Sequence, residues 1–502
     1  MNRTLHIPEI LGIIFGHLDP SDILSGKDSS RTLAALARTC KAFKNPALDA
    51  LWTFHVDLIP ALRCFPEDIW DRTLQIDQQL NFVAFRRPLT PEDWEVPLDQ
   101  WKRIKIFRIF TFDTSRISLA VCETLRICCP DSILFPNVQE VSWYDMDPRK
   151  LPILSLLLSS RLHRISIGSG ESTILSTLGN RSPDLTHVDL RGQHSGLDIL
   201  PSVVTLMSKL QRLESLFIVA ADAAILQLAA RMSRLRYLVV DKVLHFGALS
   251  LQNVPRPHFP SLEILNLWAT TVEVARTIIA ATHHPLTAVN LLCGGGLADC
   301  RTIARLYTAL AAPRVHSALH TLHIEVSGNH PEIIAGDTLR ILFPFTHLRT
   351  IVLKPYLGFD LDDDLLLEVA RTWTRVEDLR LAVLNTNHPM RVDVRVTLTG
   401  IHALAKHCPK LRNLEITFDA TSVPELKEVW AQEKLTMMRV DLSPISSPAD
   451  VATFLSRIFP GLQELESYCP CDKPKTELWK RVDRYLKAGT EFAHDDESAD
   501  GA

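Results

Sequence analysis

The 502-residue sequence predicts an α/β solenoid, a degenerate leucine-rich array whose parallel sheet lies on the concave side and whose helices lie on the convex side. Three observations predict it. A phrase of the form L-x-x-L-x-L returns from Val138 onward, helical patterns fill the intervals, and a separate helical pattern precedes the array. We divide the chain into a helical domain (1–52), a connector and N-terminal cap (53–135), the solenoid (136–485) and a disordered acidic tail (486–502).

The helical domain begins with one apolar stripe, because its apolar residues recur at helical spacing. Pro8 suits the first turn of this helix, and Glu9 suits the positive end of its dipole. A second stripe follows a polar insert at Ser25–Arg31, and Pro46 is expected to restart the chain before the domain closes at Trp52. Some fifty residues cannot bury this much apolar surface, which favours a partner.

This segment resembles the F-box, the module that docks a substrate receptor onto the Skp-family adaptor of a cullin-based (SCF) ubiquitin ligase. The matching phrases are I-P-E-I-L, I-I-F-G-H-L-D-P, L-A-R-T-C-K-A-F and the terminal A-L-W. The insert at Ser25–Arg31 departs from the family, being longer and more polar than the usual link. The resemblance implies that the following residues contact the adaptor or form the supporting core: Ile7, Pro8, Ile10, Leu11, Ile14, Leu18, Leu36, Cys40, Phe43, Leu48, Leu51 and Trp52.

The resemblance extends over about 140 residues of fungal F-box/leucine-rich-repeat proteins. It is carried by the local phrases A-L-D-A-L-W, L-I-P-A-L-R-C-F-P-E-D-I-W, F-R-R-P-L-T-P-E-D-W and F-P-N-V-Q-E-V-S-W. In that family the C-terminal repeats are thought to hold a substrate, so the resemblance implies a role without naming a target.

The repeated phrase has a period of about 27 residues, within the leucine-rich-repeat range of roughly 20–29. Its fourth and sixth positions alternate as a short strand requires, and prolines before several phrases end the preceding helix. Trp101–Ile106 is a further degenerate candidate. The thirteen phrases start at Val138, Leu162, Leu185, Leu213, Leu235, Leu262, Leu286, Leu319, Leu348, Val376, Leu411, Leu435 and Leu462.

The third, fifth and seventh positions of each phrase should project from the concave sheet and form a protein-binding surface. Trp268 and Tyr237 are the sharper candidates, since an exposed aromatic ring on a rigid strand costs solubility without a partner. A merely solvated face is the alternative. The candidate substrate-binding residues are Arg191, Tyr237, Trp268, His323, Glu325, Lys354, Arg380 and Arg439.

Composition excludes several classes of function. Apolar residues make up 46% and charged residues 22% of the chain, and the net charge is −4, so neither wholesale disorder nor a nucleic-acid-binding face is expected. Ten cysteines without a C-x-x-C pair indicate reduced thiols in a cytoplasmic or nuclear protein. No run approaches about 18 apolar residues, which gives no reason to expect a membrane span.

Two loops have residue types that could support chemistry. Asp360–Asp364 could hold a divalent cation, but capping the helix that follows explains it equally well. Cys293–Gly296 stands where a phosphate loop would, without the lysine or the glycine spacing of one. No metal-ligand spacing and no nucleophile motif occurs, so we expect no metal, no cofactor and no catalytic residue.

The leading interpretation is a substrate-recognition subunit of an SCF-type ubiquitin ligase, which binds a Skp-family adaptor, through it a cullin, and an unknown target protein. A ubiquitin-independent interaction scaffold, whose N-terminal helices only cap the solenoid, is the second. An enzyme that uses the loop at Asp360 or Cys293 is the third.

Overall fold

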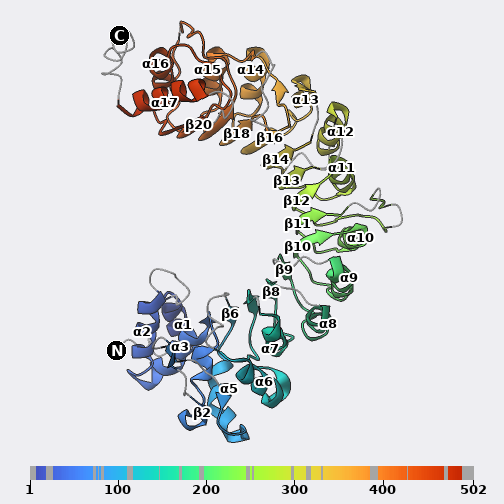
Figure 1. Ribbon diagram of the computed structural model, residues 1–502, viewed down its shortest axis with the longest axis vertical. Coiled ribbons are helices and arrows are strands. Elements are labelled where there is room, and N and C mark those ends of the chain that lie inside the picture. Colours follow the sequence, from blue (N-terminus) through green and yellow to red (C-terminus); the bar gives the residue numbers. More distant parts are fainter. Residues whose placement is uncertain are drawn as a thin grey trace. The chain divides into compact units, whose positions relative to one another are not determined.

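The computed structural model forms two compact units, residues 1–235 and 236–502. Within each unit, helices line one side of a parallel sheet (Figure 1). The fold is therefore the predicted α/β leucine-rich-repeat solenoid. The described residues are 7–18, 26–71, 75–76, 79–80, 84–109, 117–145, 147–168, 172–191, 197–244, 249–251, 254–294, 299–312, 318–328, 332–384, 394–426, 428–467 and 473–488.

The first unit opens with a helical module, formed by α1 (Pro8–Gly16), α2 (Gly26–Leu36) and α3 (Lys41–Trp52). Both α1 and α2 pack against α3. The buried centre of the module consists of Leu11, Phe15, Leu33 and Ala47.

Two expectations for this module are corrected. The polar insert is largely helical, because its residues from Gly26 onward form the first turns of α2, while Ser25 lies outside the described residues. Pro46 does not restart the chain but lies buried inside α3. A proline in a helix interior loses one backbone hydrogen bond, a cost that burial in the module offsets.

The segment after the module contributes strands as well as short connectors. Its core is an aromatic cluster around Phe65, whose ring centroid lies 5.1 Å from that of Trp94 and 5.6 Å from that of Trp101. Trp101 ends a helix in this cluster, so the strand expected at Trp101–Ile106 starts only at Ile106. The connectors are α4 (Ile59–Leu62), α5 (Glu95–Trp101) and the paired strands β2 (Trp70–Asp71) with β5 (Ala84–Phe85) and β3 (Gln75–Ile76) with β4 (Gln79–Leu80).

The parallel strands of the first unit follow the chain order. They are β1 (Phe54–His55), β6 (Ile106–Ile109), β7 (Glu140–Trp143), β8 (Arg164–Ile167), β9 (His187–Leu190) and β10 (Ser215–Ala221). The helices beside them are α6 (Leu119–Cys128), α7 (Leu151–Leu154), α8 (Ser172–Arg181), α9 (Leu200–Lys209) and α10 (Ala223–Arg231).

The second unit continues the same alternation. Its main strands are β11 (Tyr237–Val243), β12 (Ile264–Thr270), β13 (Ala288–Cys293), β14 (Thr321–Val326), β16 (Thr350–Lys354), β18 (Asp378–Leu381), β19 (Asn413–Ile416), β20 (Met437–Arg439) and β21 (Glu464–Glu466). A small second pair joins β15 (Ile334–Ala335) to β17 (Phe359–Asp360). The helices are α11 (Val272–Ala281), α12 (Cys300–Leu310), α13 (Asp337–Arg340), α14 (Asp363–Thr372), α15 (Leu398–His407), α16 (Pro448–Ile458) and α17 (Lys473–Ala488).

The thirteen phrases predict the strands correctly. Each phrase contains the start of a strand at its third position, from β7 in the phrase that starts at Val138 to β21 in the phrase that starts at Leu462. The first position of the phrase is buried in every coil except the last, where Leu462 is half-exposed. Several helices then begin at a side-chain cap that accepts a backbone N–H, a pattern shared by Asp222, Thr271, Asp299, Asp362, Thr397 and Ser447.

A final helix, α17, covers the end of the second unit. It packs against α16 and β21, with Trp479 and Val482 buried. An edge strand presents unpaired backbone groups, so a helix packed there protects β21. The acidic tail beyond Ala488 lies outside the described residues.

Candidate functional site

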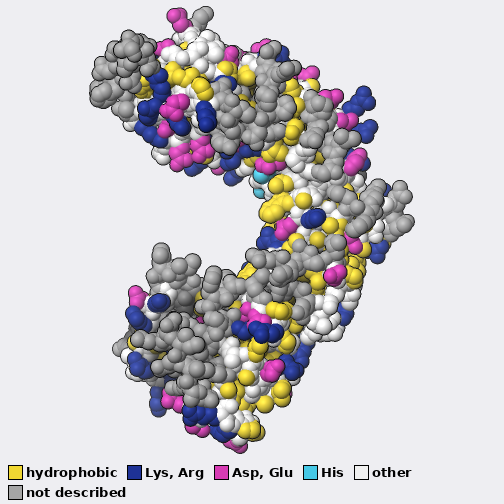
Figure 2. Space-filling view, in the orientation of Figure 1, with side chains coloured by type: hydrophobic (Ala, Val, Ile, Leu, Met, Phe, Trp, Pro, Cys, Tyr) yellow, Lys and Arg dark blue, Asp and Glu magenta, His cyan; other side chains and the backbone are white. Residues whose placement is uncertain are grey.

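The open face of the second unit is the side of its sheet turned away from the helices. Parallel pairing places its side chains in rows across the strands. Hydrophobic side chains gather over β11 to β13, whereas acidic and basic side chains mix over β16 to β20 (Figure 2). The central row of this face runs Asn266, Asn290, His323, Val352, Arg380, Glu415 and Arg439.

The charged side chains of this face have partners within the chain. The Lys354 ammonium lies 2.8 Å from a carboxylate oxygen of Glu415, and the two side chains are only 14% and 8% exposed. The His323 ring lies 2.9 Å from the Glu325 carboxylate. This hydrogen bond, followed by the charges of His323, Lys354 and Arg380, holds the pKa of Glu325 below its usual value.

Two arginines of the row are held in the same way. Arg380 donates to both carboxylate oxygens of Asp378, at 2.8 and 2.9 Å, and this contact raises the pKa of Arg380. Arg439 donates to Asp441 at 2.7 Å. The predicted charged candidates therefore lie on the expected face but neutralise their neighbours, which reduces the charge they offer to a target.

The predicted aromatic candidates are placed differently from each other. Trp268, two residues before the end of β12, is 40% exposed. Tyr237 is half-buried at the start of β11, with the Arg236 guanidinium 5.7 Å from its ring centroid. Arg191, in the first unit, donates to Asp189 and lies 4.8 Å from the ring centroid of Phe217. Trp268 is thus the most accessible of the predicted aromatic contacts.

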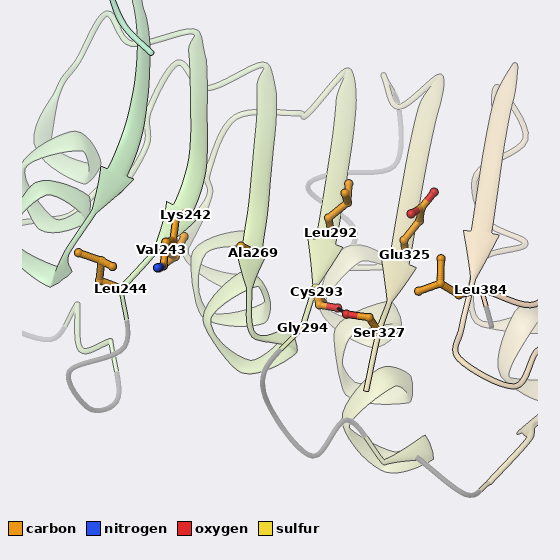
Figure 3. A pocket seen from close by; sticks show the side chains of 10 residues that line it. All are labelled: Lys242, Val243, Leu244, Ala269, Leu292, Cys293, Gly294, Glu325, Ser327 and Leu384. Atoms are coloured by element: carbon orange, nitrogen blue, oxygen red, sulfur yellow. Dashed lines mark hydrogen bonds between the residues drawn. The ribbon is translucent and has the colours of Figure 1, made fainter. Parts of the chain in front are cut away.

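Sequence reasoning missed a cavity of about 730 Å³ at the carboxyl ends of the strands of the second unit (Figure 3). In open α/β sheets this edge is the usual ligand-binding edge. Apolar and small residues dominate its wall. The lining residues are Lys242, Val243, Leu244, Ala269, Leu292, Cys293, Gly294, Glu325, Ser327 and Leu384.

An irregularity in β12 shapes this cavity. The register with β13 shifts between Leu267 and Thr270, so β12 bulges there. Ala269, within the bulge, has φ 43°, a left-handed conformation that an L-residue seldom adopts. Directly after β13, a Cβ at Gly294 would come 2.8 Å from the Ser327 hydroxyl oxygen. The lining of the cavity therefore includes small residues at Ala269 and Gly294, where longer side chains would occupy part of its volume.

The polar groups of the cavity are few. The Ser327 hydroxyl donates to the Cys293 carbonyl at 3.1 Å. Burial raises the pKa of the Cys293 thiol to about 12, so the thiol stays protonated and does not suit nucleophilic chemistry. Lys242 is exposed, and no ion pair or hydrogen bond holds its ammonium within the described ranges. The site is therefore suited to binding and offers no activated group.

The helical module carries a second candidate surface. Its predicted residues divide into a packed set, which includes Leu11, Leu18, Leu36, Phe43 and Leu51, and an exposed set, which comprises Ile7, Pro8, Ile14 and Cys40. Ile10, Leu48 and Trp52 are half-buried.

Ile13 was missed, although it is 68% exposed, more than Ile7 at 42% and Ile14 at 44%. These three isoleucines form what we call the isoleucine face. The signal was present in the sequence, because Ile13 is a large apolar residue that falls off the core stripe of its own helix.

The acidic loop caps a helix, as expected. Asp362 accepts the N–H of Leu365 at 2.9 Å as the cap of α14. Asp363 accepts the N–H and hydroxyl of Thr397 and the N–H of Gly400. Among the described residues no three His, Cys, Asp or Glu side chains group as metal ligands. Gly295 and Gly296 of the glycine loop lie outside the described ranges.

Within the part of the chain that the structure describes, no helix has the length and apolar character needed to cross a membrane.

Comparison with known proteins gives similarity to solved structures alone, since neither a protein-family model nor a curated protein matches the chain. The complex of Rad7 and Elc1 in yeast contains a chain that is 16% identical, with 62% of this chain and 77% of that chain covered and a TM-score of 0.37. In the complex of TLR13 with ssRNA13 the identity is 14%, the coverage 80% and 55%, and the TM-score 0.35. For the leucine-rich-repeat-containing protein LegL7 from Legionella pneumophila these values are 12%, 72% and 94%, and 0.26. Function therefore has to be inferred from this chain's own side chains.

Proposed function

We propose that this protein is the substrate-recognition subunit of an SCF-type ubiquitin ligase, in which the helical module binds a Skp-family adaptor and the solenoid binds a target protein. The isoleucine face is the observation that carries the proposal. Ile13 and Ile14 project outward from α1, while Leu11 and Phe15 of the same helix fill the module's core. A short helix that is apolar on both sides is typical of burial on both sides.

The join between module and sheet supports a receptor role. The Thr53 carbonyl accepts the N–H groups of Lys105 and Ile106 at 3.0 and 2.9 Å. The Arg103 guanidinium also pairs with Asp49 of α3. These contacts fix α3 against the first strands. A fixed join holds a bound adaptor against the first unit of the same chain that carries the solenoid, and tethering an adaptor and a target to one chain raises effective concentration without catalytic side chains.

Co-purification with a recombinant Skp-family adaptor tests the proposal. The full chain should retain the adaptor, and the double variant Ile13→Asp with Ile14→Asp should lose it while its melting temperature stays near that of the wild type. Exposed positions tolerate charge, whereas Leu11→Asp would disrupt the core and give an ambiguous result. Ile127→Asp is the matched control, because Ile127 is 71% exposed on α6 of the same unit. A wild-type chain that does not retain the adaptor, or a double variant that does, would refute the proposal.

A ubiquitin-independent scaffold is the second candidate, and the same join favours it. The module covers the edge strand β1, since α3 leads directly into it and the ring centroids of Trp52 and His55 lie 4.9 Å apart. Deleting residues 1–52 would uncover that edge under either hypothesis and cannot separate the two. The surface variants can, because they leave α3 and β1 in place.

A further inference from the structure

We propose that the strand-end cavity of the second unit binds an extended peptide of the target. The apolar side chains of this peptide would fill the cavity, and an acidic residue of the peptide would lie against Lys242. This inference rests on the proposed function, because it names the class of target segment that the solenoid would hold.

The apolar requirement follows from the lining. Leu244, Leu292 and Leu384 are half-buried and border the cavity, and Ala269 and Gly294 leave its floor without long side chains. A volume of about 730 Å³ suits several apolar side chains rather than one. Removing these surfaces from water is the main source of binding energy available here.

The acidic requirement follows from charge. Lys242 stands at the β11 end of the cavity and has no ion-pair partner among the described residues. Glu325 stands at the β14 end, and its lowered pKa keeps it ionised near neutral pH. An acidic residue is thus attracted to Lys242 at one end, whereas the other end presents the Glu325 carboxylate, already bonded to His323, and offers an acidic residue no such attraction; this difference favours one direction of the peptide.

The spacing gives the length of the segment. β11, β12, β13 and β14 are consecutive neighbours, so the two charged ends are about 14 Å apart at ~4.8 Å per strand. An extended chain covers that distance in about four residues at ~3.3 Å each. The expected segment has an acidic residue at one end of a short apolar run and no second acidic residue at the other.

Selection from a phage-displayed library of random 12-residue peptides on the immobilised full-length protein tests the proposal. The enriched sequences should share an apolar run that ends in one acidic residue. A labelled synthetic peptide of the enriched sequence should then bind the wild type in fluorescence anisotropy. Lys242→Glu should weaken its binding about tenfold, and replacing the peptide's acidic residue with lysine should restore binding to that variant. Leu292→Asp should abolish binding.

Two matched variants control for charge and exposure elsewhere in the unit. Lys410→Glu changes an exposed lysine outside the cavity, and Val423→Asp changes a valine that is 37% exposed in another loop. Both should leave peptide binding unchanged. The proposal is overturned if no peptide family is enriched, or if the enriched peptide is indifferent to Lys242→Glu and Leu292→Asp.

Other occupants give distinct outcomes that also overturn it. Saturable binding of dodecanoate in place of any peptide would indicate a lipid-like ligand, and a dimer in light scattering that Lys242→Glu dissociates would indicate a second copy of the chain. Peptide binding is measured in the absence of the adaptor, both for the wild type and for the Ile13→Asp, Ile14→Asp double variant, so that it does not depend on adaptor binding. Peptide binding by a chain that never retains the adaptor would refute only the proposed function, and adaptor retention without peptide binding would refute only this inference.

Discussion

Lys354 on β16 and Glu415 on β19 form an ion pair across the intervening strand β18, with 2.8 Å between the ammonium nitrogen and the nearer carboxylate oxygen. The two side chains are 14% and 8% exposed, so water screens the pair poorly. Lys354 was predicted to face a target, yet its charge is used inside the fold. The pair links strands that are not direct neighbours and so favours one arrangement of the sheet.

Removing one partner should therefore destabilise the protein. Glu415→Gln leaves the Lys354 ammonium poorly hydrated without its counter-charge, and the free energy of unfolding should fall by about 2 kcal/mol. Urea denaturation measures it. Adding Lys354→Met should recover part of the loss in a double-mutant cycle. The control is Glu464→Gln on β21, where the side chain is exposed. Equal effects of Glu415→Gln and Glu464→Gln would contradict a structural role for the pair.

The join at His55 should make stability depend on pH. Burial lowers the pKa of His55 from 6.5 to about 4, so the unfolded chain binds the proton more readily than the folded one. Stability is then full above about pH 6.5 and declines as the pH falls toward 4, by up to about 3 kcal/mol. Melting temperatures measured across this range should show the decline. His55→Phe should remove part of this decline, whereas the control His163→Phe, at an exposed histidine, should leave it unchanged.

The positions of the strands were predictable because each coil repeats one physical requirement. A strand buried on one side needs an apolar residue at alternate positions, and the phrases starting at Val138 and Leu235 meet it as fully as the regular one at Leu411. The helix caps were predictable at Asp362 for a similarly local reason.

The cavity and the ion pair could not be predicted from the sequence, because they depend on contacts between residues that are distant in the chain. The cavity is lined at the bulge in β12 and at Gly294, which directly follows β13, and neither feature belongs to the repeating phrase. The pairing of Lys354 with Glu415 joins residues from coils that are not adjacent. In the helical module, the apolar stripe of α1 could be predicted from the sequence. Which of its residues are buried, such as Leu11, and which are exposed, such as Ile14, is decided by the packing of the three helices.

Asp363 should hold two successive helices together. Its carboxylate accepts the Thr397 N–H at 2.7 Å, the Thr397 hydroxyl at 2.6 Å and the Gly400 N–H at 3.1 Å, all at the start of α15. Asp363→Ala should cost about 2 kcal/mol and speed amide exchange at Thr397 and Gly400. Asp364→Ala is the control, since Asp364 is exposed one residue later in the same helix. Unchanged exchange in Asp363→Ala would show that α15 is held by packing alone.

Trp479 should anchor the helix that closes the second unit. Its indole N–H donates to the Ser443 carbonyl at 2.9 Å, its ring meets that of Phe418 edge-on with centroids 5.7 Å apart, and it is 1% exposed. Trp479→Ala should lower the free energy of unfolding by about 3–5 kcal/mol, because it leaves a large cavity and an unpaired carbonyl.

The Trp479→Ala variant should unfold first around α17 and only at higher denaturant concentration as a whole. With α17 undocked, β21 loses its cover, so amide exchange should quicken from β21 toward β20 at denaturant concentrations that leave β12 protected. Trp430→Ala is the matched control, since Trp430 is 46% exposed and its removal opens no cavity. Trp479→Phe separates the two contributions: it keeps most of the ring packing but lacks the N–H, so it should retain most of the stability if packing dominates. A Trp479→Ala variant that unfolds like Trp430→Ala would mean that α17 does not hold the sheet edge.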